Sequence, residues 1–262
     1  MESVASVLLG ILQGLTEFLP VSSSGHLVIG QWLLGAQLGG GITFEVAVHV
    51  ATMVAILIFY RRRVAALALG ALAASGAAWR YIGKLCVATL PAVAAALAAR
   101  EWIERQFESP ALAGACLLVT GGIVWSTRYT LGKGGAGEPS WAGALLIGCA
   151  QAVAILPGIS RSGATVAAAL ALGLSPLAAA EFSFLLGVIA IAGAGVWLLP
   201  ELASASATVP QTLALGGAAA LASGLAALWL FVWLLRAQRF YLFAGYAWAA
   251  GAATLVAWAL SG

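Results

Sequence analysis

The chain has 262 residues, of which 63% are hydrophobic and 8% are charged. A soluble domain averages about 45–50% apolar and about 25% charged residues, so the composition excludes an ordinary soluble domain and indicates lipid as the solvent. The net charge of +3 comes without a clustered basic face, which argues against a nucleic-acid partner. The long Ala, Leu and Val runs favour helices over a barrel. We predict an all-α polytopic membrane protein with a single membrane domain, residues 1–262.

The first element in chain order is an interrupted apolar segment over residues 8–34. Its first half runs into the sequence Glu-Phe-Leu-Pro-Val-Ser-Ser-Ser-Gly-His at residues 17–26, and a second apolar half follows. Each half is shorter than the ~20 residues that a spanning helix needs. Bare backbone at such a break must be buried in protein or line a cavity, so we predict a re-entrant helical hairpin.

Three predicted membrane spans follow this hairpin, and three more follow a second interrupted segment. The six spans are predicted at residues 44–60, 80–99, 110–127, 181–199, 211–235 and 240–260. Basic residues concentrate in cytoplasmic loops. With residues 61–63 placed inside, nine basic residues fall in the cytoplasmic loops and only Arg100 and Arg105 fall in the outer loops. This orientation puts both termini outside, with the first hairpin entering from outside and the second from inside.

The second interrupted segment, residues 144–174, contains Pro-Gly-Ile-Ser-Arg-Ser-Gly-Ala-Thr at residues 157–165. It resembles the first segment in sequence. Phe44 lies 24 residues past Pro20, and Glu181 lies 24 residues past Pro157. Matched breaks in two halves are typical of an internal repeat with the binding site at the repeat interface. We predict an inverted-topology repeat, with one unit at about 1–130 and the other at about 140–262.

The first break carries candidates for catalysis and for metal binding. Gln13 and Glu17 are four residues apart and share a helical face. Their oxygens suit a divalent metal ion, Mg²⁺ or Ca²⁺, that would neutralise charge on transferring phosphate oxygens. His26 is a candidate nucleophile, base or acid, and Ser23 or Ser24 is a candidate hydroxyl nucleophile if a base lies near.

The second break carries candidates for phosphate binding. The guanidinium of Arg161 matches phosphate oxygens bidentately. A helix that begins near Ser160 would add backbone N–H groups that favour an anion. An ionisable group at membrane depth costs roughly 2.5–3.5 kcal/mol for a central Arg, so such groups are usually functional. The predicted substrate-binding residues of both breaks are Ser24, Gly25, Ser160, Arg161, Ser162 and Thr165.

Three other polar residues favour a structural interpretation. His49 lies four residues after Glu45 and can pair with it on one helix face. Glu45 and Glu181 follow the two breaks at distances that differ by one residue, outside the motifs themselves. We therefore expect Glu45, His49 and Glu181 to support the fold.

The two motifs resemble the signature segments of the undecaprenyl-diphosphate phosphatase family, also called the bacitracin-resistance family, and the similarity runs nearly the whole chain. The resemblance implies a hydrolase that removes one phosphate from a C55 polyprenyl diphosphate and recycles the lipid carrier for peptidoglycan synthesis. It also implies the bacterial cytoplasmic (inner) membrane, with a site open to the periplasmic side. The positions it implies as functional are Gln13, Glu17, Ser23, His26, Ser160, Arg161 and Thr165. Many members have Glu where this chain has Gln13, which implies a weaker metal site.

Two other functions fit parts of the pattern. Inverted repeats with broken helices are also transporter architecture, so a polyprenyl-phosphate flippase is the alternative. Hydrolysis needs Glu17 and His26, whereas translocation needs only cations. The acid-phosphatase-like lipid phosphatases share a Ser-Gly-His element, but their further Lys/Arg signature and their combined Ser-Arg…His…Asp signature are absent from this sequence. The expected partners are the polyprenyl diphosphate substrate and membrane lipids. A homodimer is also compatible with the sequence.

Overall fold

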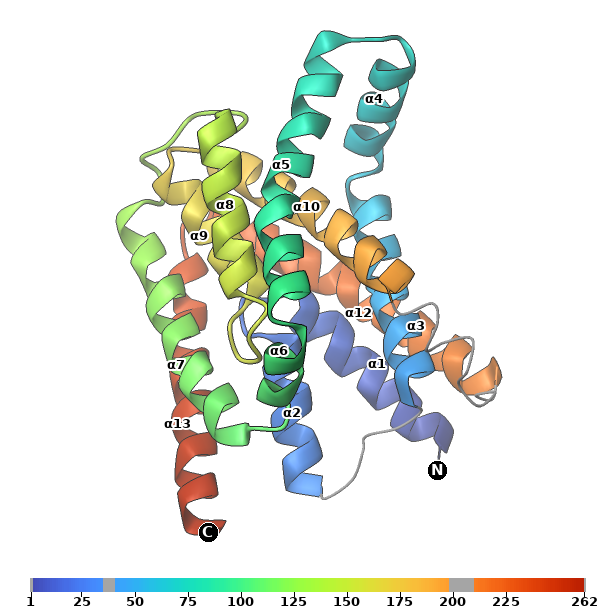
Figure 1. Ribbon diagram of the computed structural model, residues 1–262, viewed down its shortest axis with the longest axis vertical. Coiled ribbons are helices and arrows are strands. Elements are labelled where there is room, and N and C mark those ends of the chain that lie inside the picture. Colours follow the sequence, from blue (N-terminus) through green and yellow to red (C-terminus); the bar gives the residue numbers. More distant parts are fainter. Residues whose placement is uncertain (1, 35–40, 198–209, 262) are drawn as a thin grey trace.

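The computed structural model describes residues 2–34, 41–197 and 210–261, and these form helices joined by short turns (Figure 1). The α-helices are α1 (Glu2–Phe18), α2 (Ser23–Leu34), α3 (Gly41–Phe59), α4 (Arg61–Leu72), α5 (Gly76–Ala98), α6 (Arg100–Gln106), α7 (Pro110–Ser126), α8 (Trp141–Val153), α9 (Arg161–Ala171), α10 (Pro176–Trp197), α12 (Pro210–Arg236) and α13 (Phe243–Ser261). Two 3₁₀ turns, η1 (Thr127–Tyr129) and η2 (Phe240–Leu242), complete the described elements. The predicted all-α class is confirmed for this part of the chain.

Five helices are long and apolar enough to cross a membrane, namely α5, α7, α10, α12 and α13. A sixth candidate is the pair of α3 and α4, which meet at a bend of 81°. These helices cover five of the predicted spans, and the predicted span 44–60 falls on α3. The predicted span 181–199 begins within α10, and its last two residues lie outside the described residues. The chain is a polytopic helical membrane protein.

Two short helices were not predicted. The charge pattern predicts a cytoplasmic loop at residues 61–63, yet the chain continues there as α4, a run rich in Ala and Leu, which are strong helix formers. None of the residues of α4 is buried. The charged run at residues 100–106 forms α6, with Glu101 in its first turn and Arg105 in its last, as the helix dipole favours. In Figure 1 the corner between α4 and α5 lies at the end of the molecule opposite to the start of α1 and the end of α13.

The first predicted break lies between α1 and α2. Neither helix reaches spanning length, because α1 has 17 residues and α2 has 12. Pro20 lacks a backbone N–H and disfavours helical geometry in the residue before it. Ser22 then adopts a left-handed backbone with φ 65°. A non-glycine residue in that region is strained by about 1–3 kcal/mol, and such strain persists only where surrounding contacts hold it.

The second predicted break lies between α8 and α9, which have 13 and 11 residues. Gly158 takes φ 96°, a conformation that other residues rarely adopt. Ser160 caps α9, because its Oγ accepts a hydrogen bond of 3.1 Å from the N–H of Gly163. Thr120 of α7 satisfies the bare backbone of the break. Its Oγ1 donates to the carbonyl of Gly158 at 2.7 Å and accepts from the N–H of Ser160 at 3.0 Å.

The two breaks touch each other through backbone. Ser22 Oγ accepts hydrogen bonds from the N–H of Gly158 at 3.1 Å and from the N–H of Gly25 at 3.3 Å. A Cβ on Gly25 would lie only 2.8 Å from the Cα of Gly158. On the other side, a Cβ on Gly163 would lie 3.2 Å from the Cβ of Pro20. The contact therefore requires glycine at position 25.

Glycines also let the long helices approach closely. α1 packs along α12, where Gly10 faces the backbone of Gly216 and Gly14 faces Ser223. α7 packs along α13, where Gly114 and Gly251 face each other. Membrane helices associate through such small residues, because lipid offers no hydrophobic drive to bring helices together. These crossings hold α1 and α13 in place on either side of the two breaks.

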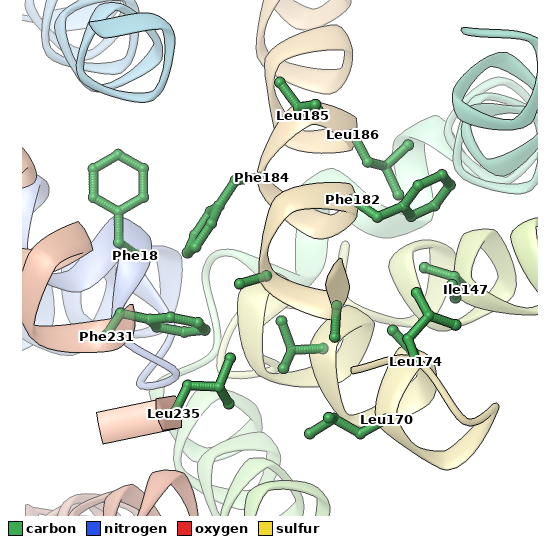
Figure 2. Packing of buried hydrophobic residues seen from close by; sticks show 14 of the residues in the cluster. Phe18, Ile147, Leu170, Leu174, Phe182, Phe184, Leu185, Leu186, Phe231 and Leu235 are labelled. Carbon is green, nitrogen blue, oxygen red and sulfur yellow. The ribbon is translucent and has the colours of Figure 1, made fainter. Parts of the chain in front are cut away.

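The apolar core fixes the end of α1, where the first break begins. Phe18, the last residue of α1, makes an edge-on ring contact with Phe184 of α10 at a centroid distance of 5.7 Å. Phe184 in turn contacts Phe231 of α12 at 4.8 Å. Figure 2 shows these three rings together, with Leu170 and Leu174 packed farther along the same cluster. All three rings are almost wholly buried, so the residue that follows Glu17 is fixed in position.

Because the breaks meet without spare space, Gly25→Ala should destabilise the fold. Overpacking of this kind typically costs about 1–3 kcal/mol. The matched control is Gly122→Ala in α7, where an added Cβ meets nothing within 4 Å. Alanine at a helix interior should raise stability there by up to about 1 kcal/mol. Thermal unfolding in detergent measures both variants, and equal melting temperatures for the two would contradict the close contact.

Candidate functional site

An ion pair joins the two breaks. Arg161 Nη2, at the start of α9, donates to Glu17 Oε1, near the end of α1, at 2.5 Å. The two residues are 144 positions apart in the chain. The Glu17 side chain is 7% exposed and the Arg161 side chain is 18% exposed. The sequence predicted both as site residues, and the structure places them in direct contact.

The second carboxylate oxygen of Glu17 collects two further predicted residues. Ser23 Oγ donates to Glu17 Oε2 at 2.8 Å, and Gln13 Nε2 donates to the same oxygen at 3.1 Å. The carboxylate therefore accepts from an amide, a hydroxyl and a guanidinium at once. Gln13 Oε1 is buried and has no hydrogen-bond partner among the described residues. A buried polar atom without a partner is costly, so this oxygen is available to a ligand or a water molecule.

A residue assigned to structural support also reaches the site. His49 of α3 places Nε2 3.9 Å from Glu17 Oε2. Its Nδ1 lies 2.8 Å from the carbonyl of Glu45, and a carbonyl only accepts, so Nδ1 carries the hydrogen. A small cavity of about 20 Å³ is lined by Gln13, Glu45 and His49. The predicted side-chain pairing of Glu45 with His49 is replaced by a bond to the backbone of Glu45.

Glu181 makes the structural contacts that the sequence suggested. Glu181 Oε1 pairs with Arg63 Nε at 2.9 Å and accepts from the Tyr81 hydroxyl at 3.2 Å. The Arg63 guanidinium lies 4.4 Å from the centre of the Tyr81 ring. These contacts join α4, α5 and α10, and none of them involves a residue of the two breaks.

The first turn of α9 gathers hydroxyl groups around Arg161. Ser160 Oγ lies 3.2 Å from Ser162 Oγ, and Ser162 Oγ donates to the carbonyl of Leu19 across the break at 3.4 Å. Thr165 Oγ1 donates to the carbonyl of Arg161 at 2.7 Å and also bonds to the hydroxyl of Ser183 in α10. The predicted residues Ser160, Ser162 and Thr165 are all buried.

α10 leaves room for the arginine. A Cβ at Gly187 would collide with the Arg161 guanidinium, so the arginine could not keep this position beside Glu17 if residue 187 carried a side chain. Gly187 and Ser183 are four residues apart in the sequence and were not predicted as site residues. The resemblance to the family runs over this part of the chain too, but neither motif contains these two residues.

His26 lies apart from this hydrogen-bond network. Its Nδ1 is 2.8 Å from the carbonyl of Ser22, and its Nε2 is 2.7 Å from the hydroxyl of Tyr246 in α13. In the part of the chain that the structure describes, neither of these hydrogen bonds involves Glu17. Ser24 Oγ likewise bonds to Ser22 Oγ, at 3.3 Å. The structure thus brings His26 to the same break as Glu17 and directs its ring toward α13.

This arrangement suits the binding of an anionic substrate and the transfer of a proton between protein side chains. Arg161 offers a planar set of donors, the first turn of α9 adds N–H and hydroxyl groups, and Ser23 and Glu17 form a hydroxyl–carboxylate pair. A hydroxyl bonded to a base is the usual arrangement of an activated nucleophile. Tyr246, Ser183 and Thr120 complete the surroundings from helices outside the motifs. No sequence pattern pointed to Tyr246.

Removing one partner of the Glu17–Arg161 pair should cost more stability than removing both charges. Arg161→Ala leaves the Glu17 carboxylate buried without its guanidinium, which typically costs about 3–5 kcal/mol. Adding Glu17→Gln removes that charge and should recover part of the loss. Arg105→Ala is the control, because its contact with Glu101 at 3.9 Å is exposed and should contribute little. Unfolding curves in detergent test this, and a double variant less stable than Arg161→Ala would contradict it.

Comparisons with known proteins agree with these features. The sequence matches the family described as Bacitracin resistance protein BacA over residues 6–253. It is 40% identical to an undecaprenyl-diphosphatase of Desulfatibacillum aliphaticivorans, over 96% of this chain and 97% of that one. It is 41% identical to an undecaprenyl-diphosphatase of Rhodopirellula baltica, over 95% of this chain and 96% of that one. With a family match over most of its length and relatives this similar, the chain belongs to the bacitracin resistance protein BacA family.

Proposed function

We propose that this protein hydrolyses undecaprenyl diphosphate to undecaprenyl phosphate and inorganic phosphate. The observation that carries the proposal is the buried pair of Glu17 and Arg161 at the contact of the two breaks, in a chain whose relatives are named undecaprenyl-diphosphatase. A buried pair at this depth is costly to maintain for structure alone. Release of phosphate from a polyprenyl diphosphate by the purified protein is the test.

Arg161 is the proposed phosphate clamp. In the absence of substrate its guanidinium is neutralised by Glu17. A diphosphate offers oxygens that the guanidinium binds in bidentate geometry, aided by the N–H groups at the start of α9 and the hydroxyls of Ser160, Ser162 and Thr165. When the substrate engages Arg161, the carboxylate of Glu17 loses its strongest partner and becomes free to accept a proton.

Ser23 is the proposed nucleophile, and Glu17 its base. The Ser23 hydroxyl already donates to Glu17 Oε2 at 2.8 Å. Attack of Oγ on the terminal phosphorus would form a Ser23–phosphate bond, break the bond to the bridging oxygen and pass the hydroxyl proton to Glu17. Water would then release inorganic phosphate. His26 is the proposed second proton-exchanging group, because it lies at the same break as Ser23. Ser24 and Gly25 lie between Ser23 and His26 in the chain.

The proposed topology is an inverted repeat, about 1–130 and about 140–262, with two re-entrant hairpins meeting in the bilayer. The helix breaks at α1–α2 and α8–α9, their short flanking helices and their mutual contact support it. The excess of basic residues at one set of loops supports an orientation with both termini and the site opening on the periplasmic side of the inner membrane. An impermeant thiol reagent should reach a single cysteine at position 104 from outside and not one at position 62.

A divalent ion, Mg²⁺ or Ca²⁺, fits the residues at the first break. The protein would contribute the unpartnered Gln13 Oε1 and the oxygens of Glu17 as ligands. No group of three His, Cys, Asp or Glu side chains that could hold a metal occurs in the described ranges. Mg²⁺ commonly binds through one or two protein carboxylates together with substrate phosphates and water. A bound ion would neutralise charge on the phosphate oxygens of the leaving group.

Arg161 should be essential for activity. Arg161→Lys keeps the charge but loses the bidentate fork, so it should lose most of the phosphate release. Arg161→Ala should lose at least as much, on the order of a hundredfold or more in rate. Arg105→Ala serves as the exposed control, and thermal melting shows which variants are folded. A folded Arg161→Ala protein that hydrolyses the diphosphate at the wild-type rate would remove Arg161 as the clamp.

Activity should depend on a divalent ion. Excess EDTA should abolish phosphate release, and added Mg²⁺ or Ca²⁺ should restore it. Gln13→Glu should lower the ion concentration needed for half-maximal activity, because it adds a second charged oxygen ligand. Calorimetric titration of the ion into wild-type and Gln13→Glu protein gives the same comparison without turnover. Full activity in excess EDTA would exclude the ion from the reaction.

A further inference from the structure

We propose that Tyr246 of α13 is a positioning residue that holds His26 for proton exchange at the phosphate site. The two side chains lie 220 residues apart in the chain, yet His26 Nε2 and the Tyr246 hydroxyl are 2.7 Å apart. Their rings stack with an interplanar angle of 10° and a centroid distance of 5.7 Å. Both the polar atom and the plane of the imidazole are therefore fixed by one residue. This inference rests on the proposed hydrolysis, in which His26 exchanges a proton.

The backbone of the first break decides which ring nitrogen carries the hydrogen. His26 Nδ1 lies 2.8 Å from the carbonyl oxygen of Ser22. A carbonyl oxygen only accepts, so Nδ1 must donate. In the neutral imidazole Nε2 then holds the lone pair, and it accepts from the Tyr246 hydroxyl. Nε2 is consequently the one ring atom that can gain or lose a proton, and Tyr246 is the group bound to it.

Ser22 connects this imidazole to the second break. Its carbonyl receives His26 Nδ1, and its hydroxyl receives the N–H of Gly158. The same residue therefore fixes the tautomer of His26 and the contact between the two breaks. The φ of 65° at Ser22 is the strained conformation on which both contacts depend.

α13 holds Tyr246 in a defined place. Two residues farther along, Trp248 Nε1 donates to the carbonyl of Leu118 in α7 at 3.1 Å. α2 and α13 both pack against α7, so His26 and Tyr246 share one support. Tyr246 is half-exposed, with a relative accessibility of 50%.

A proton can therefore reach or leave His26 Nε2 in one of two ways. It passes through the Tyr246 hydroxyl, or that hydroxyl first moves away from Nε2. A structural tyrosine would change stability only. A positioning tyrosine changes the rate of the chemical step, because acid–base groups contribute about 10²–10⁴-fold when correctly oriented. Tyr246→Phe separates the two cases, since phenylalanine keeps the stacked ring and removes the hydroxyl.

The first measurement is steady-state hydrolysis of a polyprenyl diphosphate by wild-type and Tyr246→Phe protein. We expect kcat to fall about tenfold or more, with KM within about twofold, because the change lies in proton exchange and not in phosphate binding. Tyr129→Phe is the matched control. Tyr129 is 60% exposed and its ring contacts the Arg128 guanidinium rather than the site, so its variant should keep the wild-type kcat.

The second measurement observes the ring directly and needs no turnover. The chain has two histidines, so ¹⁵N-histidine labelling gives two imidazole signal sets, and the set lost in His49→Gln assigns the other to His26. Wild type should show a protonated Nδ1 and a hydrogen-bonded Nε2 for His26 at mildly alkaline pH. Tyr246→Phe should move the His26 Nε2 signal and leave His49 unchanged.

The two measurements distinguish this inference from the proposed function. If the wild-type protein releases no phosphate, the proposed function fails whatever the ¹⁵N spectrum shows. If wild type is active and folded Tyr246→Phe retains the wild-type kcat, Tyr246 is not a positioning residue. An unchanged His26 Nε2 signal in Tyr246→Phe would also overturn the inference, because it would show that the hydroxyl is not bound there.

Discussion

The structure depends on one constraint, the burial of two stretches of bare backbone inside a protein that has lipid around it. Backbone groups that leave a helix within hydrocarbon must find partners in the protein. Here each break satisfies the other. The N–H of Gly158 bonds to Ser22, and Thr120 bonds to the carbonyl of Gly158 and to the N–H of Ser160. The ion pair of Glu17 and Arg161 lies beside this contact. The charged side chains are therefore next to the backbone groups that also need polar partners.

Electrostatics and packing act together at this point. Phe18 is held by the aromatic core, which sets the end of α1 and hence the position of Glu17. Gly187 of α10 has no side chain, and the Arg161 guanidinium occupies the space beside it. A carboxylate with a guanidinium, a hydroxyl and an amide on its two oxygens is well satisfied despite its burial, which is the condition for a stable buried charge. The pair is therefore prearranged, and in the proposed mechanism a substrate diphosphate replaces the Glu17 carboxylate at Arg161.

Composition and helix breaks predicted much of the fold. Apolar runs near spanning length, interrupted by Pro, Gly and Ser, have direct physical meaning in lipid, and the helix ends at both breaks agree with it. Within the site, Glu17 and Arg161 could be anticipated because ionisable groups are unusual inside a membrane. Ser23 could be anticipated only from its place in the first motif. Tyr246, Thr120 and Ser183 could not, because their contribution is a contact across the fold that leaves no period or spacing in the sequence. α4 was missed because its arginines suggested a helix end, whereas its alanines and leucines sustain the helix beyond them.

The glycine contact between the breaks has a consequence for how the sequence can change. Gly25 and Gly158 belong to opposite halves of the chain, and the space that a side chain at 25 would need is filled by the backbone of 158. Substitutions at touching positions do not add independently. A residue larger than glycine at 25 becomes tolerable only with a displacement of the second break, and the φ of 96° at Gly158 bars most replacements on that side. Divergence between the two halves is thus restricted at this point, so the pair must vary jointly or remain as it is.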